Sequence, residues 1–173
     1  MTGHSRRAFL WGAGGLAAAT AFRGADALAD GPRRRRPSLR GGRFAEGVMS
    51  GDPTPDAITL WTRVADVEGS GTVVLEVARD HGFGHVVARE LVRVSAASAY
   101  SVKVRVGGLR PYEQYWYRFA TRGEESAVGR FRTALPADSR QPVRFAFLSC
   151  QDWTFGFYNA HRLLAKEDVD FVV

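Results

Sequence analysis

A regular alternation of apolar and polar residues over positions 44–133 constrains the fold of this chain more than any other feature. In the segment SVKVRV, three valines alternate with Lys103 and Arg105, so the valines point to one face of a strand and the two basic residues point to the other. The same rule predicts one buried face made up of Ile58, Leu60, Thr62, Val64, Val73, Leu75 and Val77. Turn residues interrupt the pattern about every 8–12 positions, which predicts an all-β sandwich or barrel of about seven strands.

The segment GGLRPYEQYWYRF narrows this prediction to an immunoglobulin/fibronectin-like β-sandwich over residues 44–135. Tyr115 begins a strand directly after the corner that contains Pro111. This is the position of the tyrosine corner, in which the hydroxyl bonds to the preceding loop while the ring joins the core. The chain has one cysteine, so no disulfide links the two sheets.

The sequence pattern changes after Thr133, where ALPADSRQP reads as a linker. The nearly continuous apolar run VRFAFLSC predicts a strand buried on both faces. A stretch with helical spacing follows, and VDFVV then begins a second apolar strand. Residues 142–173 thus predict one βαβ unit, the first piece of an α/β domain. Because one such unit cannot bury both sheet faces, we expect the strand from Val169 to be poorly supported or to rest on the sandwich.

The first 29 residues predict a removable signal peptide. Arg6 and Arg7 form a twin-arginine pair, a short apolar stretch follows, and Ala27-Leu28-Ala29 supplies small residues for cleavage. The stretch is too short for a stable membrane span. We expect the twin-arginine translocase as a partner and an extracellular, periplasmic or wall-associated location. An ordinary secretory signal with incidental arginines is the alternative.

Residues 30–43 predict a disordered Arg-rich linker, since GPRRRRPSLRGGR contains six arginines and no acidic residue. From Phe44 onward, acidic and basic residues nearly balance, so the folded body is close to neutral. Export argues against a nucleic-acid partner for the arginines, whereas anionic wall polymers or lipid headgroups fit them. We expect a monomer.

The single cysteine, Cys150, follows the apolar strand at its carboxyl end, where α/β sheets place ligands and catalytic groups. The composition of the chain and the position of Cys150 leave three interpretations open: a buried apolar filler, a nucleophile with His161 as its base, or a thiolate ligand of a transition metal. Asp152 and Asn159 are either ligands or helix caps.

Four segments together resemble the amino-terminal part of the PhoD-like (D-type) alkaline phosphatase and phosphodiesterase family. They are FAEGVMSGDPTPDAITLWTR, LRPYEQYWYRF, SAVGRFRTALP and FAFLSCQDWTFGFYNAHRLLAKEDVDFVV, and they extend in order from Phe44 to Val173. The resemblance implies a small sandwich in front of an α/β metallophosphoesterase domain, with hydrolysis of phosphate mono- and diesters outside the cytoplasmic membrane. It also implies a centre of Fe³⁺ and Ca²⁺, in which the cysteine of the Ser-Cys-Gln segment, Cys150 here, binds the iron.

The same resemblance places the other metal ligands beyond this sequence, beginning with an aspartate in a Leu-Gly-Asp-Tyr segment after DFVV. We therefore expect this chain to be an amino-terminal fragment that is inactive alone, with no catalytic residue and no calcium ligand to assign. The alternative function is a stand-alone β-sandwich binding module of the cell wall or envelope.

Overall fold

The computed structural model describes residues 37–152, 154 and 156–173. The predicted signal peptide and the linker as far as residue 36 lie outside this range. The elements are, in order, β1 (Val48–Gly51), β2 (Ile58–Arg63), β3 (Gly71–Ala78), β4 (Val86–Val94), the 3₁₀ helix η1 (Ala96–Ser98), β5 (Ser101–Val106), β6 (Gln114–Ala120), β7 (Gly129–Arg132), β8 (Phe145–Ala146), α1 (Asn159–Leu164) and β9 (Phe171–Val172).

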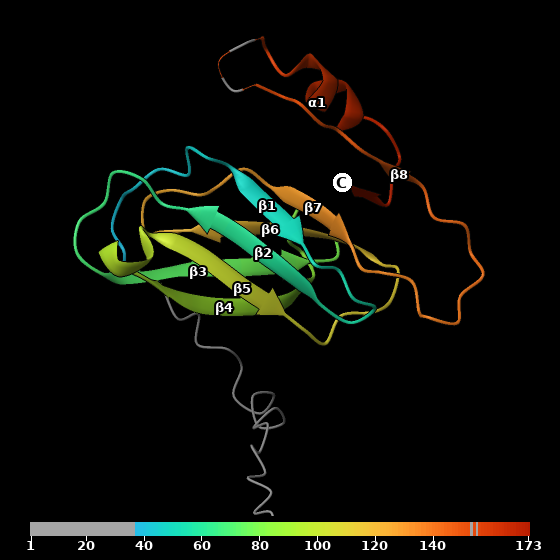
Figure 1. The fold of residues 1–173 in the computed structure, drawn as a ribbon. Coiled ribbons are helices and arrows are strands. Elements are labelled where there is room, and N and C mark those ends of the chain that lie inside the picture. Colours follow the sequence, from blue (N-terminus) through green and yellow to red (C-terminus); the bar gives the residue numbers. More distant parts are fainter. Residues whose placement is uncertain (1–36, 153, 155) are drawn as a thin grey trace, which may run out of the picture. The chain divides into compact units, whose positions relative to one another are not determined.

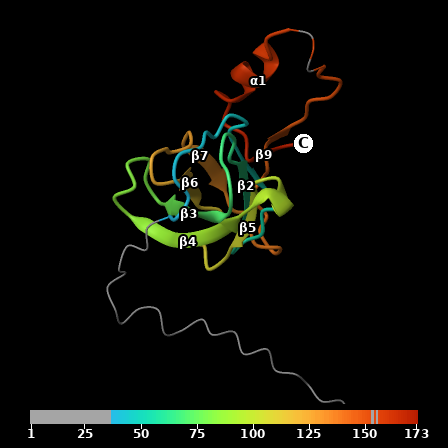
Figure 2. The same cartoon turned by 90° about the vertical axis from the view of Figure 1, so that its left-hand side faces the viewer.

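Strands β1 to β7 form two antiparallel sheets that enclose a common core (Figure 1). One sheet has the order β1-β2-β5 and the other has the order β4-β3-β6-β7. Strand β4 lies beside β5, and β1 lies beside β7, so the sheets approach each other at both edges. Figure 2 shows the same strands after a quarter turn. The prediction of a mainly β sandwich of about seven strands is confirmed.

The alternation in the sequence corresponds to the observed burial. The inward set predicted from β2 and β3 is buried throughout, and the core also contains Val94, Val102, Val106, Leu109, Tyr115, Tyr117, Phe119 and Phe131. Val104 of β5 was expected to be equally buried, but it is only partly covered. Two sheet faces that each present alternate side chains therefore build the hydrophobic core.

The tyrosine corner is present at the start of β6. The Tyr115 ring is buried, and it stacks on Phe131 with ring centroids 5.4 Å apart. Its hydroxyl accepts a hydrogen bond from the backbone N–H of Arg110 at 2.9 Å and donates to Glu113 Oε2 at 3.1 Å. One side chain thus links the core to the loop that crosses from the first sheet to the second.

The prediction of a disordered linker over residues 30–43 is wrong for residues 37–43. Leu39 is 4% exposed, belongs to the core, and donates its N–H to Thr72 O at 3.1 Å. Arg43 forms a β-bridge with Ala65. The high arginine content suggested disorder, but the burial of Leu39 offsets the conformational entropy that this short segment loses when it is ordered.

Residues 142–173 contain a parallel pair of short strands, β8 and β9, with α1 between them in sequence (Figure 1). The prediction of a first strand buried on both faces is wrong, since Phe147 is 73% exposed and Phe145 is also exposed. α1 has only six residues, none of them buried. Within the described part of the chain, no second layer covers these apolar side chains.

Candidate functional site

Cys150 lies at the carboxyl end of the β8–β9 pair, as its sequence position predicts. The ladder extends beyond the regular strand, because the N–H of Leu148 donates to Val173 O at 3.0 Å. Two residues later, Cys150 has a φ of +56° and a free, exposed thiol. This exposure contradicts the interpretation of Cys150 as a buried apolar filler.

The described side chains give Cys150 no general base. His161 lies on α1 and packs edge-to-face on Tyr158, with ring centroids 5.3 Å apart. Among the described residues, no hydrogen bond or ion pair joins His161 to Cys150. A nucleophilic cysteine needs a base within hydrogen-bonding reach, so the arrangement does not support this interpretation.

Asp152 and Asn159, for which the sequence left caps or ligands open, do not cap α1, and among the described residues they belong to no group of three potential metal ligands. Asp152 Oδ1 accepts hydrogen bonds from the N–H and the hydroxyl of Thr154, at 2.8 and 2.7 Å. These two bonds lower the pKa of Asp152 below its ordinary value, so it is an anion at neutral pH. Asn159 Oδ1 accepts from Arg162, and the residue at the N-cap of α1 is Tyr158, which makes no side-chain cap.

These side chains do not by themselves fit an Fe³⁺ or Ca²⁺ centre. Nowhere in residues 37–152, 154 and 156–173 do three His, Cys, Asp or Glu side chains come close enough to hold a metal ion. Cys150 offers one thiolate, whereas iron and calcium sites need several ligands each. Any such centre would require further residues.

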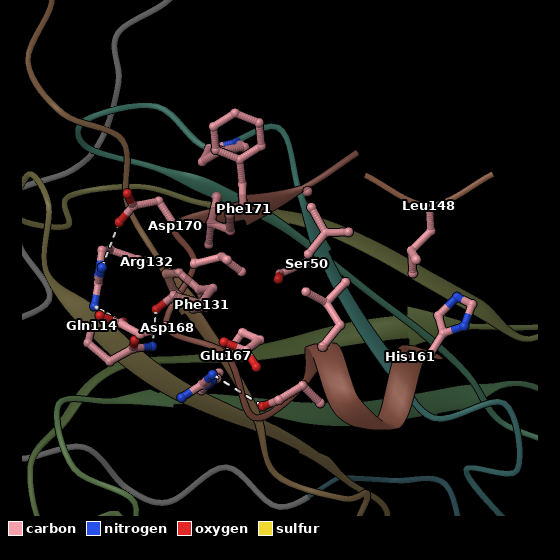
Figure 3. A pocket seen from close by; sticks show the side chains of 18 of the residues that line it. Ser50, Gln114, Phe131, Arg132, Leu148, His161, Glu167, Asp168, Asp170 and Phe171 are labelled. Carbon is pink, nitrogen blue, oxygen red and sulfur yellow. Dashed lines mark hydrogen bonds and ion pairs between the residues drawn. The ribbon is translucent and has the colours of Figure 1, made fainter. Parts of the chain in front are cut away.

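A cleft of about 600 Å³ lies between the sandwich and the carboxyl-terminal segment (Figure 3). The sandwich contributes residues 50–53, Ile58, Gln114 and residues 130–132 of β7, while the other wall comes from Leu148, His161 and residues 164, 165 and 167–172. Its charged groups have both signs, with arginines on β7 facing acidic residues that precede β9. This mixture does not define one class of small ligand.

The carboxylate of Asp170 accepts three hydrogen bonds in the cleft, and its side chain is 11% exposed. Its Oδ1 accepts hydrogen bonds from Arg132 Nη1 at 2.6 Å and from the Tyr112 hydroxyl at 3.0 Å. Its Oδ2 accepts from the N–H of Arg144 at 2.8 Å. Burial opposes ionisation of this carboxyl, but the three donors outweigh burial and lower the pKa of Asp170 below its ordinary value.

Arg132 completes this cluster from β7. Its guanidinium lies 5.0 Å from the centre of the Tyr112 ring, and one nitrogen is 3.9 Å from Asp168 Oδ1. Burial favours its neutral form, yet the hydrogen bond to Asp170 and the nearby negative charges raise the pKa of Arg132. The sequence analysis did not identify this cluster. The available signal was a single carboxylate inside the apolar run VDFVV.

These observations define the architecture of the chain: an antiparallel β-sandwich is followed by a parallel strand–helix–strand unit. No helix among the described residues is both long and apolar enough to cross a membrane.

Comparison with known proteins identifies the family. Residues 29–135 match the family described as PhoD-like phosphatase, N-terminal domain. Alkaline phosphatase D of Bacillus subtilis (strain 168) is 39% identical over 138 residues, which cover 75% of this chain and 24% of that protein. A solved structure of PhoD matches with a TM-score of 0.71 and 38% identity, over 75% of this chain and 26% of that one. The chain therefore belongs to the PhoD-like phosphatase family, and it spans about a quarter of the length of these relatives.

Proposed function

We propose that this chain forms the amino-terminal part of an exported, metal-dependent phosphomonoesterase and phosphodiesterase of the alkaline phosphatase D type. The observation that carries the proposal is the 39% identity to alkaline phosphatase D over three quarters of the chain. In this proposal, residues 44–135 are the accessory sandwich and residues 142–173 begin the metallophosphoesterase domain. The alternative of a stand-alone binding module is not favoured, because the similarity to a phosphatase covers so much of the chain.

Cys150 is the residue that we assign to an Fe³⁺ site. Its exposed thiol at the carboxyl end of a parallel strand pair supports this role, since metal ligands in α/β domains commonly occupy that edge. Calcium would need oxygen ligands from other parts of the full-length enzyme. When bound, the two cations would supply positive charge that neutralises phosphate oxygens during ester hydrolysis.

Export through the twin-arginine route is part of the proposal, and it rests on Arg6 and Arg7 ahead of a short apolar stretch. This route carries proteins that have already folded, so a metal could be bound before export. Replacing both arginines by lysine in the full-length protein should retain it in the cytoplasm. Unchanged export of that variant would remove the twin-arginine step from the proposal.

The 173-residue chain alone is expected to be inactive, because its described residues do not assemble a group of three potential metal ligands. An assay with aryl phosphate mono- and diesters in the presence of iron and calcium checks this. Turnover clearly above that of Cys150→Ala would contradict the expectation.

A chimera tests the function itself. In it, this chain replaces the aligned segment of Bacillus subtilis alkaline phosphatase D, and both ester hydrolysis and iron content are measured. We expect an active, iron-containing chimera. Cys150→Ala should lower activity by at least about tenfold and reduce iron content with it, whereas Ser149→Ala, a matched change at the neighbouring exposed position, should retain both. A Cys150→Ala chimera with full iron content would refute the assignment of Cys150.

A further inference from the structure

Asp170 is a nearly buried carboxylate in a segment whose other side chains are largely exposed. We infer that Asp170 is the docking residue that holds the β8–β9 pair against the sandwich, through Arg132 of β7 and Tyr112 of the corner before β6. This role concerns the joint between the two regions and does not depend on the proposed phosphatase function.

The first support is the number of segments whose donors meet at this carboxylate; Figure 3 shows one of these contacts, between Arg132 and Asp170. Arg132 and Tyr112 belong to the sandwich, and both donate to Oδ1. Arg144, just before β8, donates its N–H to Oδ2, and the N–H of Asp170 donates back to Arg144 O at 2.7 Å. One side chain therefore bonds to the sandwich with one oxygen and to the residue that precedes β8 with the other.

The second support is the weakness of the other polar contacts across this joint. Asp168 also approaches Arg132, but it is 67% exposed and the separation is 3.9 Å. Arg130 reaches Ala165 O only at 3.5 Å, the limit for a hydrogen bond. α1 buries no residue. Exposed ion pairs contribute little, so the partly desolvated cluster around Asp170 carries most of the docking.

The third support is that Asp170 takes part both in the contact with the sandwich and in the pairing of β8 with β9. Asp170 precedes β9 directly, and the ladder continues from it through Val173 N–H to Ala146 O at 2.9 Å and Leu148 N–H to Val173 O. Loss of the carboxylate would free both strands from the sandwich together. If Cys150 is a metal ligand, Asp170 also positions β8, the strand that leads to Cys150. Only this link between Asp170 and the metal ligand rests on the proposed function.

Hydrogen exchange of the full 173-residue chain tests the inference. Asp170→Asn keeps the shape of the side chain but places an amide between three donors, so it should leave at least one of them unpaired. We expect exchange at the amides of residues 146–148 and 170–173 to rise at least about tenfold, with no change in β2, β3 and β6. Asp168→Asn, the matched control at the exposed carboxylate, should change it by less than about twofold.

Three results would overturn the inference. They are rapid exchange at these amides already in the parent chain, an unchanged rate in Asp170→Asn, and equal effects of the two Asp→Asn variants. A double-mutant cycle adds a further check, because Arg132→Gln and Asp170→Asn break the same interaction. The double variant should therefore exchange little faster than the worse single variant. Multiplication of the two single effects would show that the residues act independently and would also overturn it.

Discussion

The sandwich and the carboxyl-terminal strand–helix–strand unit are both rich in apolar residues, but only the sandwich buries them. Phe119 of β6 is 0% exposed, whereas Phe157, just before α1, is 89% exposed. In the sandwich, each sheet covers the inward face of the other. The strand–helix–strand unit has no opposing layer among the described residues, and it is tied to the sandwich mainly by a charged cluster. An apolar sequence pattern therefore predicts burial only where a second layer is available.

The largest expected difference between the two regions concerns their phenylalanines. Phe119→Ala leaves a cavity between the sheets and should lower the free energy of unfolding by about 3–5 kcal/mol. Phe157→Ala removes a side chain that is already in solvent and should change it by less than about 0.5 kcal/mol. Urea unfolding followed by circular dichroism measures both, and similar losses would show that residue 157 is part of a core.

A smaller effect is expected from close packing within the sandwich. A Cβ atom at Gly129 of β7 would lie 2.4 Å from the Tyr117 ring, which is itself fixed in the core. Gly129→Ala should therefore destabilise the protein by about 1–3 kcal/mol. Gly107→Ala is the matched control, since an added Cβ there meets nothing within 4 Å. A thermal melt compares them, and equal stability of the two variants would contradict this account of β7.

The two tyrosine hydroxyls offer a finer comparison of the regions. Tyr115→Phe removes the bond to the Arg110 N–H and should lower the stability of the sandwich by about 1 kcal/mol. Tyr112→Phe removes a bond to Asp170 and should leave sandwich unfolding unchanged, while it raises exchange in residues 170–173. If Tyr112→Phe destabilised the sandwich as much as Tyr115→Phe, the two regions would not be separable in this way.

The smallest expected effect concerns pH. The pKa of Asp170 is lowered from its ordinary value of 3.8, since three donors outweigh its burial. A carboxylate whose pKa is lowered by docking favours the docked form above its ordinary pKa, and this contribution is lost as the pH falls through the lowered value. NMR signals of Leu148 and Val173 should therefore stay in the docked position from neutral pH to about 4 and move below it. Movement that begins near neutral pH would implicate another group.

Most of the sandwich could be predicted from sequence because alternation is a local pattern with a direct physical cause. The strands around Leu60 and Leu75 and the corner at Tyr115 follow from it. The burial of Leu39 could not be predicted, since it depends on contacts with a strand more than thirty residues away. The predicted burial of Phe147 was wrong for the opposite reason: the pattern indicates that a residue suits a core, not that a covering layer exists.

The candidate site also has one part that the sequence pointed to, Cys150, and one part that it did not, the cluster around Asp170. Residue patterns left the role of Cys150 open, and only the family resemblance selected a metal ligand, which stays a prediction. The Asp170 cluster joins residues 112, 132, 144 and 170, so its geometry arises only when the two regions meet. No local pattern encodes that meeting, although an aspartate within an apolar run indicated that its charge needed a partner.

Because the two sheets of the sandwich cover each other's inner faces, the sandwich should fold without β8, α1 and β9, and deleting these elements tests this. A chain of residues 37–135 keeps β1 to β7 and the segment around Leu39, and it lacks β8, α1 and β9. It should unfold cooperatively, with a free energy of unfolding within about 1 kcal/mol of that of the full chain in urea. A truncated chain that lacks a cooperative transition, or that is several kcal/mol less stable, would contradict the account.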